Sequence, residues 1–328
     1  MTKRKLTTFF FILGLIALVA LLPLFVKDVY YIHILTNLCL HSVFAVSLWP
    51  ILAMGELAIS HGAFIAIGAY ASSVMVMRLG MSSWLASLMS AVAGFLIALI
   101  IGYPSLRVKG AYFFLLTFAF TMTVVLSFSY LFKPIFGGAE GIANVPPFSS
   151  LVIAGRSVEF SGKIENFYVA LLLMLFTVGI VYSLYHSRFG RALAAIRMSD
   201  LLAEHIGVDV RNYKVFNFAI CSALAATAGS FFAHYHGHVS PTAFPPTLGI
   251  KILFYVIVGG GSYISGAILG VVVLDILEET FREFGQYEVL ASSLFVLIIM
   301  LFMPHGLLGG LRMLKSQIFK LLRVKVAG

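Results

Sequence analysis

Glu56, Ser60 and His61 are the first residues whose types could do chemistry, because they lie close together between two apolar stretches. Carboxyl, hydroxyl and imidazole groups are costly at membrane depth unless they are paired or hydrated. Gly62 and Phe64 follow directly, and glycine permits a helix break and a close approach of two backbones. A broken helix offers free amide and carbonyl groups to a polar substrate. The segment is therefore a candidate part of a translocation pathway; the alternative is that Glu56 and His61 only reach water at a membrane rim.

The loop 186–214 holds the second group of polar residues. Phe189, Leu193 and Ile196 recur at helical spacing, so one face of this stretch is apolar, and Arg191 and Arg197 lie off that face. Guanidinium groups form forked hydrogen bonds with carboxylates or carbonyls of a partner. We therefore expect a short amphipathic helix whose Leu193 and Ile196 fill a groove on another protein. A helix lying on the lipid surface is the alternative.

A second short helix is predicted directly after the first. Ser199 and Asp200 are typical N-cap residues. Leu202 and Ile206 lie about one turn apart on a shared face. Gly207 suits the position after the helix end, which often takes a left-handed conformation. The loop thus carries two short helices with a few apolar side chains, a pattern that fits contact with a partner.

Catalytic and metal-binding motifs are missing from the sequence: there is no P-loop, no G-x-S-x-G and no H-E-x-x-H. Ser60 and His61 are adjacent, so on a helix their side chains point about 100° apart and cannot act as nucleophile and base. His234 and His238 have a helical metal-ligand spacing around His236. They lack an evident third ligand and sit at a predicted helix end. We predict no catalytic residue, no metal site and no cofactor bound by this chain.

The elements that must position these residues are membrane helices. Of 328 residues, 61% are hydrophobic and 11% charged, against about 45–50% and about 25% in soluble proteins. This excludes a water-soluble domain and a disordered chain. The formal net charge is +9, but the basic residues gather in short patches between apolar runs. That distribution is typical of a protein whose partner is the lipid bilayer and excludes a nucleic-acid groove.

A helix needs about 20 apolar residues to span a bilayer. Such runs occur at 7–26, 32–53, 60–77, 84–102, 111–132, 167–185, 215–235 and 290–308. The stretch 249–281 differs, because Gly259, Gly260 and Gly261 break it into two short pieces. We predict an all-α, polytopic integral membrane protein, a single domain over 1–328. It has about eight full transmembrane helices plus a broken or re-entrant pair, about ten segments in all.

Charge predicts the orientation of these segments. With the cations at 3–5 in the cytoplasm, counting crossings places the loop 186–214 inside. The loop 133–166, rich in glycine, proline and serine, falls outside. Most of the 22 lysines and arginines then lie on the cytoplasmic side.

The tail 309–328 holds five cations and no acid, so it should also be cytoplasmic. This requires the pair 249–281 to return to the side that it left. Both termini are then cytoplasmic, and the acidic residues that follow the pair lie outside: Asp275, Glu278, Glu279, Glu283 and Glu288.

Several motifs follow one another in a fixed order along most of the chain. They are GELAISHGAF at 55–64, GAY at 68–70, RVKGAYF at 107–113, TFAF at 117–120, GGAEGI at 137–142, GRALAAIR at 190–197, AEHIG at 203–207, GGGSYISG at 259–266 and PHGLLG at 304–309. In this order the motifs resemble the LivM-type permease subunit of branched-chain amino-acid ABC transporters.

The resemblance implies an importer in the bacterial cytoplasmic (inner) membrane. Its expected partners are two cytoplasmic ABC ATPase subunits that bind the ATP, an extracytoplasmic solute-binding protein and a second permease subunit, in a heterodimer or a homodimer. Loop 186–214 then corresponds to the ATPase-coupling loop, with Gly190, Arg191, Leu193, Ile196, Arg197, Glu204 and Gly207. The candidate translocation pathway comprises Glu56, Ser60, His61, Gly62, Phe64, Thr117, Gly259, Gly260 and Gly261.

The sequence departs from the family pattern at a few positions. Glu56 stands where glutamine is usual, and Ala139-Glu140 stand where Thr-Asp is frequent. The expected solute is a branched-chain amino acid, and urea, a short amide or another small solute is the alternative. A standalone secondary transporter would need ion-binding carboxylates within the membrane, for which Glu56 is the one candidate. A membrane enzyme would need a facing nucleophile and base.

Overall fold

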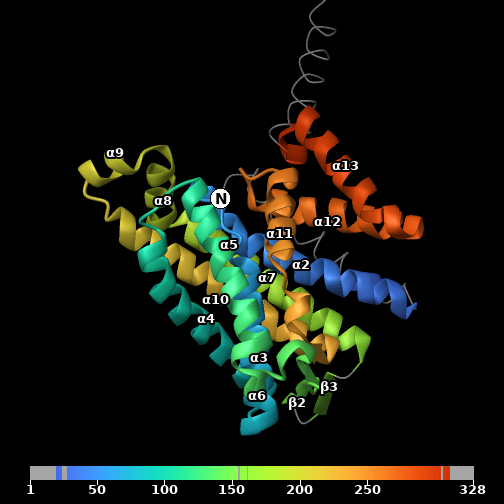
Figure 1. The fold of residues 1–328 in the computed structure, drawn as a ribbon. Coiled ribbons are helices and arrows are strands. Elements are labelled where there is room, and N and C mark those ends of the chain that lie inside the picture. Colours follow the sequence, from blue (N-terminus) through green and yellow to red (C-terminus); the bar gives the residue numbers. More distant parts are fainter. Residues whose placement is uncertain (1–19, 24–27, 154–155, 161, 304–305, 311–328) are drawn as a thin grey trace, which may run out of the picture.

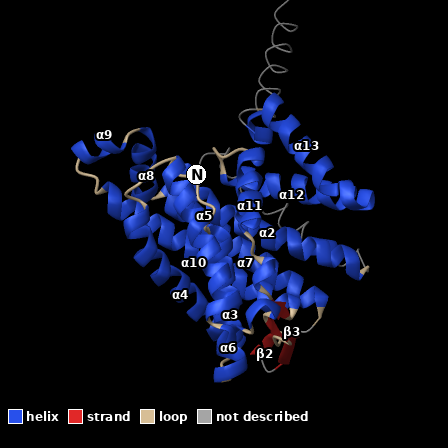
Figure 2. Ribbon diagram, viewed as in Figure 1, coloured by secondary structure: helices blue, strands red, loops and turns tan. Residues whose placement is uncertain are grey.

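The computed structural model describes residues 20–23, 28–153, 156–160, 162–303 and 306–310, and helices dominate it (Figures 1 and 2). The long helices are α2 (Val29–Ala53), α3 (His61–Leu79), α4 (Ser83–Ser105), α5 (Ala111–Leu126), α7 (Lys163–His186), α10 (Val210–His236), α11 (Pro246–Gly259), α12 (Ile264–Phe281) and α13 (Glu288–Phe302). The short ones are α6 (Lys133–Phe136), α8 (Arg188–Met198) and α9 (Asp200–His205).

Eight helical stretches in the described part of the chain are long and apolar enough to cross a membrane. They include a helix for each predicted run from 32 onward; the run 111–132 corresponds to α5 and the π-helical turn Ser127–Leu131 that continues it. The predicted all-α, multi-pass architecture is therefore confirmed. Of the predicted first crossing only residues 20–23 are described, and of the basic tail only 309–310. Both predictions lie essentially outside the described residues.

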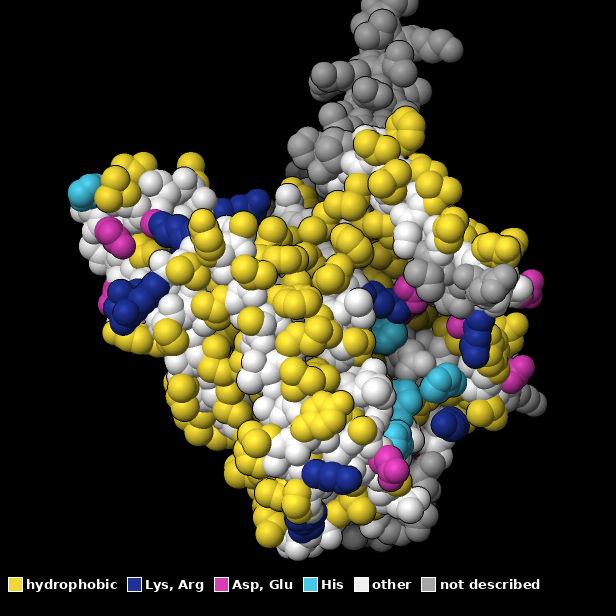
Figure 3. All heavy atoms as spheres, in the orientation of Figure 1, with side chains coloured by type: hydrophobic (Ala, Val, Ile, Leu, Met, Phe, Trp, Pro, Cys, Tyr) yellow, Lys and Arg dark blue, Asp and Glu magenta, His cyan; other side chains and the backbone are white. Residues whose placement is uncertain are grey.

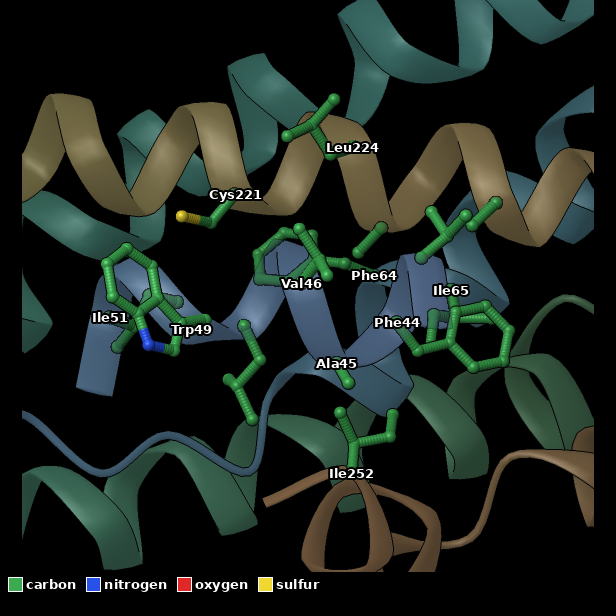
Figure 4. Packing of buried hydrophobic residues seen from close by; sticks show 14 of the residues in the cluster. Phe44, Ala45, Val46, Trp49, Ile51, Phe64, Ile65, Cys221, Leu224 and Ile252 are labelled. Atoms are coloured by element: carbon green, nitrogen blue, oxygen red, sulfur yellow. The ribbon is translucent and has the colours of Figure 1, made fainter. Parts of the chain in front are cut away.

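Helix α10 lies at the centre, with α3 and α4 packed along it (Figure 1). A Cβ atom on Gly68 of α3 would lie 1.9 Å from the carbonyl oxygen of Ala226, and one on Gly229 would lie 1.9 Å from that of Ile65. Only glycine allows these backbones to approach so closely, as is typical of membrane helix pairs. Side chains of α2, α3 and α10 meet in the adjoining core, which Ile252 of α11 approaches from another side (Figure 4).

The predicted broken pair is a helical hairpin made by α11 and α12. Gly260 connects them at φ +114°, a conformation that disfavours side chains. A Cβ atom on Gly259 would lie 1.8 Å from the carbonyl oxygen of Gly266, so the helices touch where they diverge. Farther along, Lys251 of α11 pairs with Glu278 of α12, so the two helices are antiparallel. The second helix thus returns toward the side from which the first one comes.

The predicted loop 133–166 contains short regular elements besides irregular chain. Strands β2 (Phe148–Ile153) and β3 (Arg156–Phe160) form an antiparallel hairpin (Figure 2). Strand β1 (Ile142–Ala143) pairs with β4 (His238–Val239), directly after α10. These strands gather at one end of the helices, opposite α8 and α9 (Figure 1).

Large apolar side chains cover the lateral surface in the space-filling view (Figure 3). They include Ile100 on α4, Leu172 on α7 and Leu301 on α13, each about 70% exposed. A surface of this kind is stable against lipid tails and is costly in water. Charged side chains gather instead around α8 and α9 and around a hollow on the opposite flank (Figure 3). The fold thus suits a multi-pass membrane protein.

Candidate functional site

The chain between α2 and α3, which we call the 54–60 segment, is not helical. Gly55 turns the backbone at φ +96°, and α3 begins only at His61. The amide of Ile59 donates to Thr117 Oγ1 of α5 at 3.2 Å. The carbonyl oxygen of Ile59 lies so near Gly249 of α11 that a Cβ atom there would be 2.2 Å away. The predicted helix break is confirmed, and it brings three helices together.

Glu56, on this segment, belongs to a buried charge network. Lys214 Nζ at the start of α10 donates to Glu56 Oε1 at 2.9 Å, and both side chains are about 5% exposed or less. The same ammonium contacts Asp200 Oδ2 at 3.1 Å. Lys109, between α4 and α5, also pairs with Asp200. Glu56 therefore does not simply reach water at a rim: it is buried and paired.

The protonation of Asp200 follows from this network, which we define as Glu56, Lys214, Asp200 and Lys109. Burial opposes ionisation of the carboxyl, but the hydrogen bonds from Lys109 and Lys214 outweigh that cost and lower the pKa of Asp200 below its ordinary 3.8. Asp200 is therefore ionised at neutral pH and holds both lysines.

Ser60, His61, Gly62 and Phe64 are all buried where α3 begins. His61 Nε2 lies 3.0 Å from Ser47 Oγ of α2. His61 Nδ1 and Ser60 Oγ have no partner among the described residues. Gly62 faces the backbone of α11. The Phe64 ring packs against aromatic rings of α5 and α10, so within this chain it is a packing residue.

The turn at Gly259, Gly260 and Gly261, between α11 and α12, contacts the same region through a side chain of α2. Trp49 Nε1 donates to the carbonyl oxygen of Gly261 at 2.9 Å, while Gly259 and Gly260 form the tip of the α11–α12 hairpin. The structure thus brings the predicted pathway residues into one neighbourhood around the end of α2. They do not line either of the two cavities described next, and their role in a pathway stays a prediction.

Two cavities flank helix α12. The larger, about 780 Å³, lies between α11, α12 and α13 and is mostly apolar, with Leu274 and Val296 among its walls. The smaller, about 240 Å³, lies between α2 and α12 and is lined by polar groups such as Asn37 and Arg282. Glu278 borders both cavities.

The α2–α12 cluster, which we define as His41, Lys251, Tyr255, Asp275 and Glu278, adjoins the smaller cavity. His41 Nδ1 lies 2.6 Å from Asp275 Oδ2, and the hydroxyl of Tyr255 also donates to Asp275. Lys251 pairs with Glu278 at 2.5 Å. Such contacts hold neighbouring membrane helices together.

The expectation that Asp275, Glu278 and Glu279 follow the broken pair is wrong. They lie within its second helix, α12, and the Asp275 side chain is only 12% exposed. The physical reason is that partners on α2 and α11 compensate for removing these carboxylates from water.

Helices α8 and α9 confirm the two helices predicted in the loop 186–214. The predicted role of Leu193 and Ile196 in filling a partner's groove is wrong, because these side chains are 0% and 2% exposed. The apolar face of α8 packs against α7, α10 and α2 of the same chain. Four other apolar side chains lack such cover and are 63–89% exposed: Met198, Leu201, Leu202 and Ile206.

The ends of α9 follow the sequence closely. Ser199 is the N-cap and accepts a hydrogen bond from the amide of Leu202 at 3.3 Å. Gly207 lies beyond the last turn at φ +84°, as predicted. Its neighbourhood is open, so a side chain there would meet strain in the backbone rather than a clash.

The charged residues and Gly190 of the loop take different places. Arg191, Arg197 and Glu204 are exposed. The aliphatic stem of Arg197 lies beside Gly55 of the 54–60 segment. Gly190 is buried, and a Cβ atom on it would lie 2.0 Å from the carbonyl oxygen of Tyr185, so it allows the sharp turn from α7 into α8.

The three histidines after position 233 take separate places. His234 is buried, and its Nδ1 lies 2.7 Å from the carbonyl oxygen of Pro146. His236 Nδ1 lies 3.0 Å from that of Phe232. His238 is exposed in β4. The first two therefore have backbone partners of their own.

Sequence reasoning missed the connection made by Lys214, which it treated only as one of several cytoplasmic cations. The available signal was its position directly before the apolar run 215–235, where a lysine must find a partner or reach water. Its partners could not be read from the sequence, because Glu56 is 158 residues away.

Comparison with known proteins gives consistent results. A sequence model of the family described as "Branched-chain amino acid transport system / permease component" matches residues 30–304. The chain is 31% identical over 277 residues to the high-affinity branched-chain amino acid transport system permease protein LivM of Escherichia coli, a match that covers 77% of this chain and 64% of that protein. It is 26% identical over 271 residues to the permease protein LivH of Salmonella typhimurium, covering 78% and 86%.

Another relative is the probable LivM permease of Methanocaldococcus jannaschii, 27% identical over 243 residues, in a match that covers 68% of this chain and 67% of that protein. The chain spans less than two thirds of the length of the Escherichia coli LivM that it matches. No solved structure gives a significant match. The family match over most of the chain, together with its membrane helices and glycine hairpin, leads to one conclusion: the chain belongs to the family of branched-chain amino acid transport permease components.

Proposed function

We propose that the chain is the membrane-spanning permease subunit of an ABC importer and that it forms part of the translocation pathway. The supporting observation is the exposure of two apolar side chains, Leu202 on α9 and Ile206 at its end. The neighbouring helix α8 packs against the membrane helices. An exposed apolar face on an ordered helix favours a groove on a partner protein. The membership in a transport permease family supports the same reading.

The partners follow from this assignment. Two cytoplasmic ATPase subunits bind ATP and one of them receives α9, so this chain needs no nucleotide site of its own. A solute-binding protein docks at the opposite end, where the strands β1 to β4 gather. A second permease subunit completes the pathway; the relatives include both LivM and LivH proteins, which favours a heterodimer over a homodimer.

Orientation and location belong to the same proposal. The chain lies in the bacterial cytoplasmic membrane with both termini inside, and α8 and α9 face the cytoplasm. The antiparallel α11–α12 hairpin supports this, because it returns the chain to the side that it left. Cysteine labelling tests it: Ser149 to Cys should react from outside and Ser316 to Cys only from inside.

The proposed solute is a branched-chain amino acid, since the relatives carry that name. Urea or a short amide is the alternative, because a binding protein selects much of the solute in such an importer. Uptake of leucine, isoleucine and valine by the reconstituted complex, in competition with urea, separates the two. Competition by urea alone would overturn the amino-acid assignment.

A standalone secondary carrier is the second candidate, and Asp275 favours it as a carboxylate that lies between helices and is 12% exposed. Liposomes with the purified chain alone distinguish the two functions. An importer subunit neither hydrolyses ATP nor concentrates solute by itself. Accumulation of solute by the isolated chain in an ion gradient would overturn the proposed function.

Coupling to the ATPases gives a further test. Gly207 to Val should strain the end of α9, and Arg197 to Glu should repel acidic groups on the ATPase. We expect both variants to insert and to bind the solute-binding protein, while ATP hydrolysis no longer drives uptake. Unchanged uptake in both variants would show that α8 and α9 only lie on the lipid surface.

A further inference from the structure

Helix α9 touches the body of the protein through a narrow contact. Of its six residues only Ala203 is buried, and Leu201 and Leu202 are more than 60% exposed. Asp200 at its first position makes the polar contacts, with Lys214 at 3.1 Å and with Lys109. Besides its backbone connections to α8 and α10, Asp200 and the lysines that hold it are therefore the side-chain route by which a displacement of α9 reaches the body.

Lys214 connects this contact to the 54–60 segment. Its ammonium group lies between Asp200 and Glu56, 3.1 Å from one carboxylate and 2.9 Å from the other. The segment that carries Glu56 also contacts α5 and α11 through Ile59. Lys214 is thus a direct side-chain link between α9 and the junction of α2, α5 and α11.

Stability alone does not explain the network. The free energy needed to remove two charges from water offsets much of their attraction, and a protein with apolar residues of similar size in their place is often as stable. The pairing is directional, however, and Glu56 Oε2 has no partner in the described residues. The ammonium group of Lys214 therefore has a second acceptor on the same carboxylate, which allows an alternative arrangement without loss of pairing.

We propose that Lys214 is a positioning residue that transmits movement of α9 to the 54–60 segment, so that ATPase binding and closure reshape the junction of α2, α5 and α11. The proposal rests on the proposed importer function. It requires that α9 takes different positions in two states of the protein. It also identifies Lys214 as the residue through which this movement reaches the membrane helices.

Spin labels at two exposed sites test the transmission in the whole complex in proteoliposomes. One label replaces His205 on α9, which is exposed. The other replaces Leu57 on the 54–60 segment, whose side chain is 38% exposed. The native cysteines, Cys39 and Cys221, are buried and free. In the wild-type background, trapping the ATP-bound state should change the label mobility at both sites.

The double variant Glu56→Gln/Lys214→Met removes both charges together and so avoids an unpaired buried ion. We expect the label on α9 still to respond to ATP, the label at 57 to stop responding, and leucine transported per ATP to fall at least tenfold. The matched control Lys251→Met/Glu278→Gln removes an ion pair from α11 and α12 that does not touch α9. It should keep the response at 57.

The following outcomes on the labels overturn the proposal. A wild-type label at 57 that ignores ATP shows that the segment does not move. A double variant that still responds at 57 shows that Lys214 is not the link, and a control that loses the response shows that the loss is nonspecific. If the double variant does not assemble, Asp200→Ala removes the carboxylate that holds α9 and leaves the pair of Glu56 and Lys214 in place, and a preserved response at 57 then refutes the proposal. A wild-type complex that hydrolyses ATP but accumulates no solute refutes the proposed function instead, while the labels still report on transmission.

Discussion

The charge network and the α2–α12 cluster both place carboxylates and cations between helices, but they connect different things. The network joins α9, an exposed helix of six residues, to the 54–60 segment, which is not helical. The cluster joins long helices to one another through pairs such as His41 with Asp275. One region links a surface element to an irregular interior segment, and the other reinforces a helical hairpin.

The pairing of the carboxylates also differs, and it distinguishes charges that stabilise the helix packing from charges that allow a movement. In the cluster, the carboxylate of Asp275 has partners on both oxygens. In the network, one oxygen of Glu56 has none among the described residues. A carboxylate with partners on both oxygens favours one arrangement, whereas a carboxylate with an unused acceptor allows two.

The largest expected effect is a difference in unfolding free energy between two single lysine substitutions, one in each region. Lys214→Met leaves Glu56 buried without its partner, and breaking such a pair costs about 3–5 kcal/mol of unfolding free energy. Lys251→Met breaks a pair whose side chains are both 34% exposed, which costs about 0–1 kcal/mol. Thermal unfolding in detergent measures both variants. Equal losses would remove the distinction between the regions.

The next effect contrasts α8 and α9. Leu193→Asp buries a charge at a site that is 0% exposed, so the protein should fail to fold or insert. Leu202→Asp changes a site that is 65% exposed, so the fold should persist while binding of the ATPase falls at least tenfold. Size-exclusion chromatography measures folding of each variant without the ATPase and complex formation with it. Tight ATPase binding by Leu202→Asp would move the docking surface elsewhere.

A smaller effect is expected in the cluster. Asp275→Asn keeps the shape of the side chain and weakens its hydrogen bonds with His41 and Tyr255, which should cost about 1–3 kcal/mol. The amount of solute transported per ATP should stay within about twofold of wild type, since a lost hydrogen bond here does not touch α9. Uptake and ATPase activity in the same liposomes measure the ratio. A tenfold fall would place the cluster in the coupling machinery.

The smallest effect is a pH dependence of the network. The pKa of Asp200 lies below its ordinary 3.8 in the folded protein, so its ion pairs stabilise the fold above about pH 4 and are lost as the pH falls through the lowered value. The stability difference between wild type and Asp200→Asn should therefore be constant from pH 8 to about pH 5 and shrink below about pH 4. A difference that changes near pH 7 would mean that another group controls the network.

Much of the fold could be predicted from local patterns. Runs of about 20 apolar residues predict helices because a bilayer leaves no other way to satisfy the backbone. The three glycines at 259–261 predict a break, and the hairpin turns there. Ser199 and Gly207 predict the ends of α9 because caps depend on neighbouring backbone groups.

The candidate site could be predicted only in part. Apolar spacing on α8 and α9 indicates that each helix has a face to cover, but it does not say what covers it. The tertiary structure buries Leu193 and Ile196 inside the chain and leaves Leu202 and Ile206 exposed. The spacing is similar in both helices, but α8 packs against α7, α10 and α2, whereas α9 contacts chiefly α8.

The sequence by itself determined that this protein is a bundle of membrane helices with a broken hairpin and a capped pair of short helices between two crossings. Those features depend on interactions within a few residues or with the lipid. Only the tertiary structure decided that Glu56 meets Lys214, 158 residues away, and that Asp275 lies against His41, 234 residues away. A charge in a sequence says that it needs a partner, and the packing of distant helices decides which partner it has.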